Sequence, residues 1–328
     1  MNNIEEKRKK IKEINERLFL TEEDKKYIKD KMKEYYGVYD NKINKYNYPF
    51  GYSELKGKIN RIPELNKTPV NEQRPVVKFK QDIYKNELRK IITFLLLHLE
   101  DFSDFESIML FVAKRRQIIE FLKLEIANHI LFGKFRVNSK YSYNLTSQFQ
   151  YSKASHLIPN LKNKNQIKYK NIDLTKIKLN KINNENNGEW IWNHTKGKFI
   201  LDLLQEINKI YEEFKKSLSN KNNKEKSKNL LSKLYWLYMQ TCPFERGSAS
   251  IGEIIFSALL QKHFDCDFKL FKERFSPQII PDIHALTYPL EKFQSIFWDQ
   301  FVSCENYKNN FSRNSNWNNY IRNRGSDF

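Results

Sequence analysis

The chain has 328 residues, of which 40% are hydrophobic and 14% aromatic, enough for one large core or two of ordinary size. Its formal net charge of +19 predicts a positive surface, but the Lys/Asn/Ile-rich usage, typical of an A/T-rich genome, weakens that charge as evidence for a nucleic-acid partner. No apolar run approaches the roughly 18 residues of a membrane span, and no apolar signal-peptide region follows the charged start, so we expect no membrane span.

The number and spacing of the cysteines indicate the redox state of the compartment in which the protein works. Cys242, Cys266 and Cys304 are odd in number and have no C-x-x-C spacing. They therefore predict neither a disulfide framework nor a zinc site, and they favour a reducing compartment. We expect a cytoplasmic location, either in the producing cell or, after secretion, in a host.

Residues 1–36 carry nearly balanced charge, with apolar residues at helical spacing. Thr21 followed by three acidic residues is typical of a fresh helix start. We predict a helical N-terminal arm of two helices, broken near residues 19–21 and packed on the body of the protein. Residues 37–80 have closely spaced Gly, Pro, Asn and Tyr without a sustained period, which predicts an irregular loop region.

Residues 81–305 are predicted to form a helical core domain. It opens with a helical hairpin, from helices over 81–100 and 104–132, with a turn and a cap at 101–104. The basic cluster Lys114-Arg115-Arg116 on the second helix has two readings, a solvated face or a phosphate-facing cluster.

Residues 133–196 form a polar insertion in this domain, where lysine greatly outnumbers acid. Apolar residues alternate at 167–170 and 177–179, which predicts short strands and a small β-hairpin. Tyrosines stand between the lysines, an arrangement that can stack bases beside a phosphate-binding groove. Further helices are expected at 198–218, 229–239, 254–260 and 289–304, followed by a flexible tail over 306–328. The fold class is therefore mainly α, a multi-helix globular fold with a small β-hairpin and a helical N-terminal arm.

The stretch Thr241–Glu253 carries the densest chemistry and lies between two apolar helical runs. The first amides of a helix have no partner within it, and the helix dipole is positive there, so a small-residue entry can seat a phosphate. Arg246 would neutralise that phosphate, Gly247 would let the backbone approach, and the hydroxyls of Ser248 and Ser250 would donate hydrogen bonds. A purely structural alternative is a capping box formed by Ser250 with Glu253.

Residues 242–250 resemble a degenerate version of the Fic motif, H-P-F-x-x-G-N-G-R, of the Fic/Doc-like (Fido) family, which also sets its motif between two helices. Pro243, Phe244 and Gly247 match it. The resemblance covers this one loop. It implies transfer of a nucleotide or phosphate-containing group onto a hydroxyl, and it makes the insertion a candidate for the family's target-holding hairpin.

The departures concern the catalytic positions. Cys242 stands where the family has its histidine, the general base that deprotonates the target hydroxyl. Arg246 stands at the acidic position before the glycine, with Glu245 adjacent. The family's Asn, Gly and Arg fall on Ser248, Ala249 and Ser250.

A replacement base is therefore needed. His284 is the first substitute, because Asp282 two residues earlier can orient its imidazole, and an ordinary imidazole titrates near pH 6.5 against about 8.5 for a thiol. A hydrogen-bonded structural histidine is the alternative. The catalytic candidates are thus Cys242, His284 and Glu245. No metal ligands are assigned, since Asp265 and Asp267 lack a third ligand nearby.

Together with the helix start at this loop, the resemblance implies a transferase that moves a nucleotide or phosphate-containing group onto a protein or small-molecule hydroxyl, and it suggests a secreted bacterial effector or toxin. ATP, with Mg²⁺, is the expected donor, and a host or self protein is the expected target. The alternative is a non-enzymatic basic protein that binds RNA or another acidic partner, although nucleic acid is not favoured.

Overall fold

The computed structural model describes residues 2–36, 74–122, 134–136, 142–144, 167–181, 188–219, 223–268 and 281–304. The chain forms two compact units. The first comprises residues 1–139 and 242–254, and the second comprises residues 140–241 and 255–328. Most of the predicted loop region and the predicted tail lie outside the described residues. Residues 74–80, which we expected in the loop, are helical instead.

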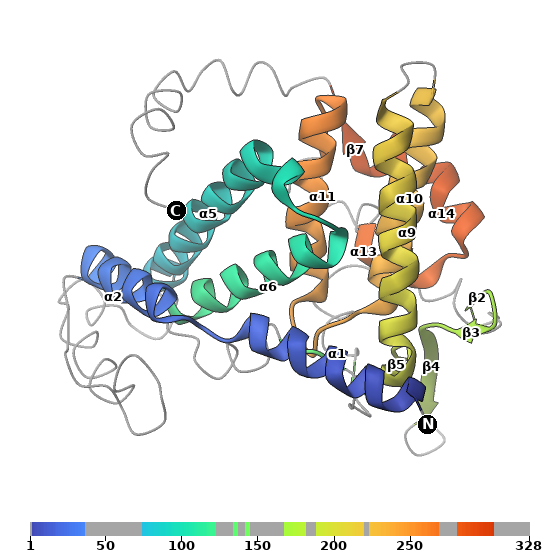
Figure 1. Ribbon diagram of the computed structural model, residues 1–328, viewed down its shortest axis with the longest axis horizontal. Helices are drawn as coiled ribbons and strands as arrows, with labels where there is room; N and C mark the ends of the chain where they lie inside the picture. Colours follow the sequence, from blue (N-terminus) through green and yellow to red (C-terminus); the bar gives the residue numbers. More distant parts are fainter. Residues whose placement is uncertain are drawn as a thin grey trace. The chain divides into compact units, whose positions relative to one another are not determined.

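Helices dominate the first 122 residues of the first unit. They are α1 (Asn2–Leu18), α2 (Glu22–Tyr36), α5 (Arg74–His98) and α6 (Phe105–Leu122), with a single 3₁₀ turn at Leu99–Asp101. Figure 1 shows α5 and α6 joined by this short turn as the predicted hairpin. Asp104 caps α6 as expected, because its Oδ1 accepts a 2.7 Å hydrogen bond from the Ser107 amide. The predicted continuation of α6 beyond Leu122 lies outside the described residues.

The two helices of the N-terminal arm break where the sequence predicts. The Thr21 hydroxyl accepts a hydrogen bond from the Asp24 amide, and the Asp24 carboxylate accepts one from the Thr21 amide, so the start of α2 is a reciprocal capping box. Four apolar side chains of the arm are buried, and α1 and α2 both contact α6. These are Ile14, Leu18, Ile28 and Met32. The arm is therefore packed on its unit, as predicted.

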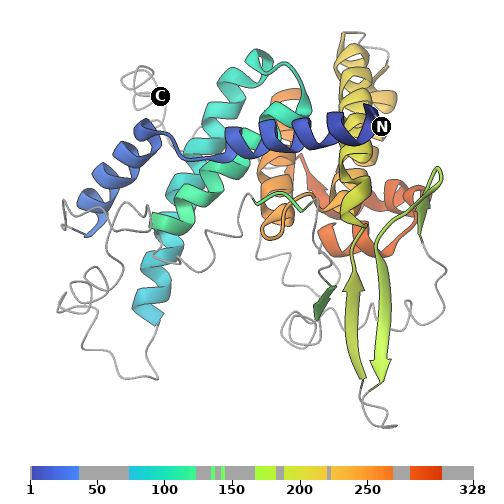
Figure 2. The same cartoon turned by 60° about the horizontal axis from the view of Figure 1, so that its bottom comes forward.

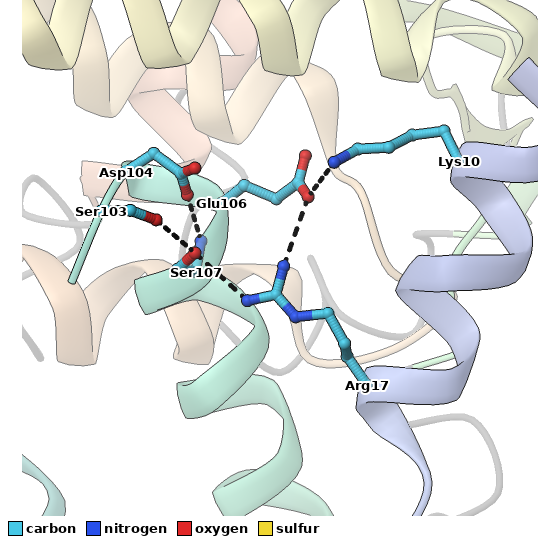
Figure 3. A network of polar contacts seen from close by, with 6 residues as sticks. All are labelled: Lys10, Arg17, Ser103, Asp104, Glu106 and Ser107. Atoms are coloured by element: carbon cyan, nitrogen blue, oxygen red, sulfur yellow. Dashed lines mark hydrogen bonds and ion pairs between the residues drawn. The ribbon is translucent and has the colours of Figure 1, made fainter. Parts of the chain in front are cut away.

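A buried carboxylate fastens α1 to the start of α6. Lys10 Nζ lies 2.8 Å and Arg17 Nη1 lies 3.7 Å from the same oxygen of Glu106, and Figure 3 shows both cations reaching it from α1. Arg17 also donates to the Ser107 hydroxyl at 3.1 Å. Because Glu106 is only 5% exposed, its charge needs these partners in order to be buried.

The basic cluster on α6 is used within the first unit. Lys114 forms a 2.7 Å ion pair with Asp24, and the Arg115 guanidinium lies over the rings of Tyr27 and Phe111. Arg116 is 4% exposed and pairs with Glu120 at 2.9 Å. The solvated-face reading of this cluster is therefore wrong for Arg116, which is a core residue.

The second unit holds α9 (Ile200–Leu218), α10 (Lys224–Thr241), α13 (Pro281–Thr287) and α14 (Leu290–Ile296). Helix α11 (Ser248–Phe264) contributes its first seven residues to the first unit and the rest to the second. Figures 1 and 2 both show α9 and α10 side by side. With these helices, the mainly α fold class is confirmed.

Short antiparallel strands complete the second unit. Strands β1 (Ser142–Asn144), β5 (Gly188–Asn193) and β4 (Lys176–Lys181) form one sheet in that order, and β2 (Lys168–Tyr169) pairs with β3 (Ile172–Asp173). Figure 2 shows β4 and β5 as a long ribbon. The predicted alternation at 167–170 and 177–179 falls on β2 and β4, so the small β-hairpin is confirmed.

Aromatic rings fill the core of the second unit. Tyr235 of α10 stacks on Phe293 with ring centroids 5.8 Å apart and lies 5.5 Å from Phe297. A buried amide ties the strand region to the helices: Gln240 Oε1 accepts from the Thr175 amide at 3.1 Å, and its Nε2 donates to the Ala285 carbonyl at 2.8 Å. This hydrogen bonding satisfies polar groups that would otherwise be costly to bury.

The cysteine prediction is wrong. Cys266 and Cys304 form a disulfide, whereas Cys242 is not disulfide-bonded. Parity and spacing missed the pair because the two cysteines are 38 residues apart and are brought together by β6 (Asp267–Phe268) and β7 (Val302–Ser303). Over the residues that the structure describes, no helix is long and apolar enough to cross a membrane.

Candidate functional site

The turn that joins α10 to α11 is held by a short extended segment of the first unit. Phe135 and Phe244 form an antiparallel bridge, flanked by hydrogen bonds from the Arg136 amide to the Pro243 carbonyl at 2.8 Å and from the Glu245 amide to the Lys134 carbonyl at 2.9 Å. The two phenylalanine rings meet edge to face, with centroids 6.0 Å apart. The turn backbone is therefore fixed by pairing as well as by the helices on either side.

Arg136 holds the start of the turn from within the protein. Its side chain is 1% exposed, and its Nε donates a 2.9 Å hydrogen bond to the backbone carbonyl oxygen of Cys242. Cys242 has a φ of 46°, in the left-handed region that non-glycine residues seldom occupy. The charge-assisted hydrogen bond stabilises a carbonyl that this conformation turns toward Arg136.

The end of the turn is closed by small residues. Gly247 has a φ of 85°, which favours glycine, and its carbonyl oxygen accepts the first hydrogen bond of α11 from Ile251 at 2.9 Å. The Ser248 hydroxyl accepts from the Phe244 amide at 3.0 Å and lies 3.2 Å from the Phe244 carbonyl. Ser248 is 6% exposed, so its hydroxyl serves the turn itself.

Ser250 has a structural contact of the same kind. Its Oγ donates to the Gly247 carbonyl at 3.0 Å and accepts from Arg116 Nε at 3.3 Å. Helix α11 begins at Ser248, three residues before Ile251, where a helix capped by Ser250 and Glu253 would begin. The capping-box alternative is wrong, because Gly247 and Ser248 start the helix earlier.

Glu245 is the buried carboxylate of the turn. The residue is 6% exposed, and its Oε1 lies 3.0 Å from Lys134 Nζ. Its Oε2 is buried and has no hydrogen-bond partner among the residues that the structure describes. A carboxylate oxygen in this state is a strong acceptor for a donor brought by a ligand.

Arg246 is the exposed member of the turn. It lies between the buried Glu245 and the left-handed Gly247, directly before the first residue of α11. The turn therefore presents a guanidinium beside the positive end of a 17-residue helix.

The turn also lies within the part of the chain that matches a known protein family. The model of the avirulence protein family AvrB_AvrC matches residues 134–303, which is more than half of the chain. The match begins at the segment that pairs with the turn and includes α9, α10, α11, α13 and α14. The chain belongs to the AvrB_AvrC family. This is a family of bacterial effectors, which are secreted into host cells and imply a host protein target. No curated protein gives a significant match to the sequence.

Membership of the AvrB_AvrC family corrects the resemblance to the Fic motif. The family comparison finds AvrB_AvrC and no Fic or Fido family. Three identical positions in one loop misled the sequence comparison, because Phe244 and Gly247 also serve the turn for structural reasons. Phe244 is buried against Phe135, and Gly247 takes a left-handed φ.

His284 lies in a different environment from the loop that the sequence predicted for it. It belongs to the second unit and lies within α13, not in a loop, with 3% of its surface exposed. Its ring contacts those of Tyr288 and Phe301, with centroids 5.2 Å and 5.1 Å away. These contacts are those of a core histidine, the structural alternative.

The described residues were also compared with the requirements of a metal site. Across the described ranges, no group of three or more His, Cys, Asp or Glu side chains could hold a metal ion.

The sequence did not predict a role for Arg136 and Lys134, which frame the turn. Both residues stand in a short segment without helical or strand periodicity. The AvrB_AvrC match, which starts at residue 134, is the signal that marks this segment.

Proposed function

We propose that this effector is a transferase that acts in the host cytoplasm and moves a nucleotide or phosphate-containing group onto a hydroxyl of a host protein. The observation that carries the proposal is the turn before α11. It is fixed by Arg136, the Phe135–Phe244 bridge and Ser248, while Arg246 stays exposed beside the helix start. Rigid backbone with one exposed cation is what recognition of an anion at a helix N-terminus requires.

The proposal assigns phosphate binding to Arg246 and to the first amides of α11. Gly247 has no side chain to block the approach of a phosphate, and Arg246 can form a bidentate contact with two phosphate oxygens. Ser248 and Ser250, which we expected to bind the ligand through their hydroxyls, already use them on turn carbonyls and amides. Their contribution is therefore to the shape of the turn.

In this proposal the Glu245 carboxylate is the general base that accepts the proton of the target hydroxyl. The oxygen of the target hydroxyl would attack phosphorus, the bond from phosphorus to the leaving group would break, and the hydroxyl proton would pass to Oε2 of Glu245. The leaving group is pyrophosphate if the nucleotide is transferred and the nucleoside diphosphate if the terminal phosphoryl group is transferred. Lys134, paired with the other carboxylate oxygen at 3.0 Å, would position Glu245 for this role. Cys242 is the second candidate for this role, and His284 has none because it is packed in the second unit.

ATP is the proposed donor. The described residues offer no metal-ligand cluster, so Mg²⁺ would arrive on the phosphates of the nucleotide, as this ion commonly does. Its chemistry there is to neutralise charge on the leaving phosphate.

The experiment is nucleotide-dependent thermal stabilisation of the purified full chain, with ATP in the presence and absence of Mg²⁺. Wild type is compared with Arg246→Ala and, as a matched control, with Arg89→Ala, which removes another exposed arginine of the same unit. Stabilisation that is lost in Arg246→Ala and kept in Arg89→Ala supports the proposal. Absence of stabilisation in wild type contradicts it, and steeply salt-dependent RNA binding that ignores Arg246→Ala would favour the non-enzymatic alternative.

A further inference from the structure

The Cys266–Cys304 disulfide closes the end of a very short ladder. Strand β6 pairs with β7 through Asp267 opposite Ser303 and Phe268 opposite Val302. In this register Cys266 and Cys304 are the next directly opposed pair, and their sulfur atoms are bonded. Two residue pairs alone make a marginal ladder, so the covalent bond is the main fastening of β7 to β6.

The segment between the two cysteines carries much of the aromatic core of the second unit. It includes α13, α14 and the single π-helical turn Phe297–Phe301, which leads directly into β7. Phe297 and Phe301 are buried, and Phe301 contacts the rings of His284 and Phe293. Only the two residues of β7 separate Cys304 from the turn Phe297–Phe301, so breaking the disulfide should affect the packing of this turn.

The two cysteines differ in exposure. Cys266 is 3% exposed, whereas Cys304 is an exposed residue at the end of β7. An attacking thiolate must reach one of the two sulfur atoms, and exposed disulfides are the labile ones, while protected structural disulfides resist reduction. The position of Cys304 gives a reductant access to this bond.

Effectors of the AvrB_AvrC family pass into host cells. Cytoplasm is kept reducing by small thiols and dithiol proteins, which remove accessible disulfides. We propose that the Cys266–Cys304 bond is a redox latch, closed under oxidising conditions and opened by thiol reductants of the host cytoplasm. This inference rests on the family and on the β6–β7 pairing, and it is independent of the transferase activity.

The reaction is thiol–disulfide exchange. A reductant thiolate attacks the sulfur of Cys304 and displaces the thiolate of Cys266, which takes up a proton. A second reductant thiol then attacks the mixed disulfide and releases Cys304 as a thiol. Two electrons pass to the protein, two reductant thiols become one disulfide, and the covalent link between β6 and β7 is lost while their backbone pairing remains.

The test uses the full chain, equilibrated in glutathione buffers from fully oxidised to a cytoplasmic ratio and then alkylated after denaturation. In the oxidised protein one cysteine, Cys242, should be alkylated, and at the cytoplasmic ratio all three should be. Reduction should lower Tm by about 5–10 °C, given the length of the closed loop. It should also speed amide exchange in the Phe297–Ser303 peptides and leave that of α9 unchanged.

Two variants make the outcome decisive. Cys304→Ser should match the reduced wild type in Tm and amide exchange and should ignore reductant. Cys242→Ser should respond to reductant like wild type. The proposal is overturned if the bond survives at the cytoplasmic glutathione ratio, if it does not form under oxidising conditions, or if reduction leaves Tm and exchange unchanged.

Discussion

Arg136 and Cys242 are 106 residues apart in the sequence, yet Nε of Arg136 donates a 2.9 Å hydrogen bond to the backbone carbonyl oxygen of Cys242. The bond places a nearly fully buried guanidinium under the first residue of the turn before α11. The geometry of the candidate site therefore depends on a side chain outside the turn.

Replacement of this arginine should loosen the turn. Arg136→Met keeps much of the buried volume but removes the charged donor, and we expect a loss of about 2 kcal/mol in the free energy of unfolding. Urea denaturation measures the loss. Arg89→Met, at an exposed position, should unfold like wild type. Equal stability of Arg136→Met and wild type would show that the turn does not need Arg136.

The two left-handed residues of the turn should respond differently to substitution. Gly247→Ala adds a Cβ at a φ of 85° and should cost about 1–2 kcal/mol. Cys242→Gly relaxes a non-glycine residue at a φ of 46° and should leave stability close to that of wild type. Thermal denaturation of the two variants side by side tests this, and similar losses in both would refute the conformational argument.

The ion pairs of Glu106 with Lys10 and Arg17, here called the Glu106 clamp, should contribute to the stability with which α1 packs on α6. Glu106→Gln removes a buried charge that binds Lys10 and Arg17, and we expect about 1–2 kcal/mol less stability and faster amide exchange in α1. Glu16→Gln is the matched control, because the Glu16 side chain is 58% exposed and its pair with Lys12 is 3.9 Å long. Unchanged exchange in α1 of Glu106→Gln would contradict the clamp.

Asp267 should give the protein a characteristic pH dependence. Burial raises the pKa of Asp267, and this outweighs the hydrogen bonds from Ser257, the Phe268 amide and Gln261 that lower it. With the folded pKa above the unfolded one, the folded state holds the proton longer, so this residue's contribution to stability falls as pH rises from the ordinary carboxyl value through the raised one.

Asp267→Asn should remove that fall. We expect its stability relative to wild type to increase across this pH window, as measured by urea denaturation at successive pH values. Asp265→Asn is the control, since Asp265 is exposed and asparagine tolerates its φ of 54°. A constant difference between Asp267→Asn and wild type at all pH values would show that Asp267 does not titrate in this way.

Local sequence signals predicted the features that depend on neighbouring residues. Thr21 and Asp24 are three residues apart, and the capping box they form needs nothing else. Asp104 caps α6 for the same reason. The fold class followed from such signals, since helical periodicity is a property of a continuous segment.

Features that depend on distant residues were missed or misread. Ser250 fits a capping box by spacing, but its hydroxyl accepts a hydrogen bond from Arg116, 134 residues away, and donates one to the Gly247 carbonyl. The pairing of Cys266 with Cys304 needs the β6–β7 ladder, which neither strand signals alone. His284 looks like a loop base until Tyr288 and Phe301 are seen to surround it.

The most direct test of the central claim is transfer of label from nucleotide to host protein. Full-length wild type, Arg246→Ala and Arg89→Ala are incubated with host cell lysate, Mg²⁺, and ATP labelled in the α-phosphate or the γ-phosphate, and labelled proteins are detected after separation. We predict a labelled host protein with wild type and Arg89→Ala and at least a tenfold loss with Arg246→Ala. No label with wild type, or equal label with Arg246→Ala, would contradict the assignment of this turn as the transfer site.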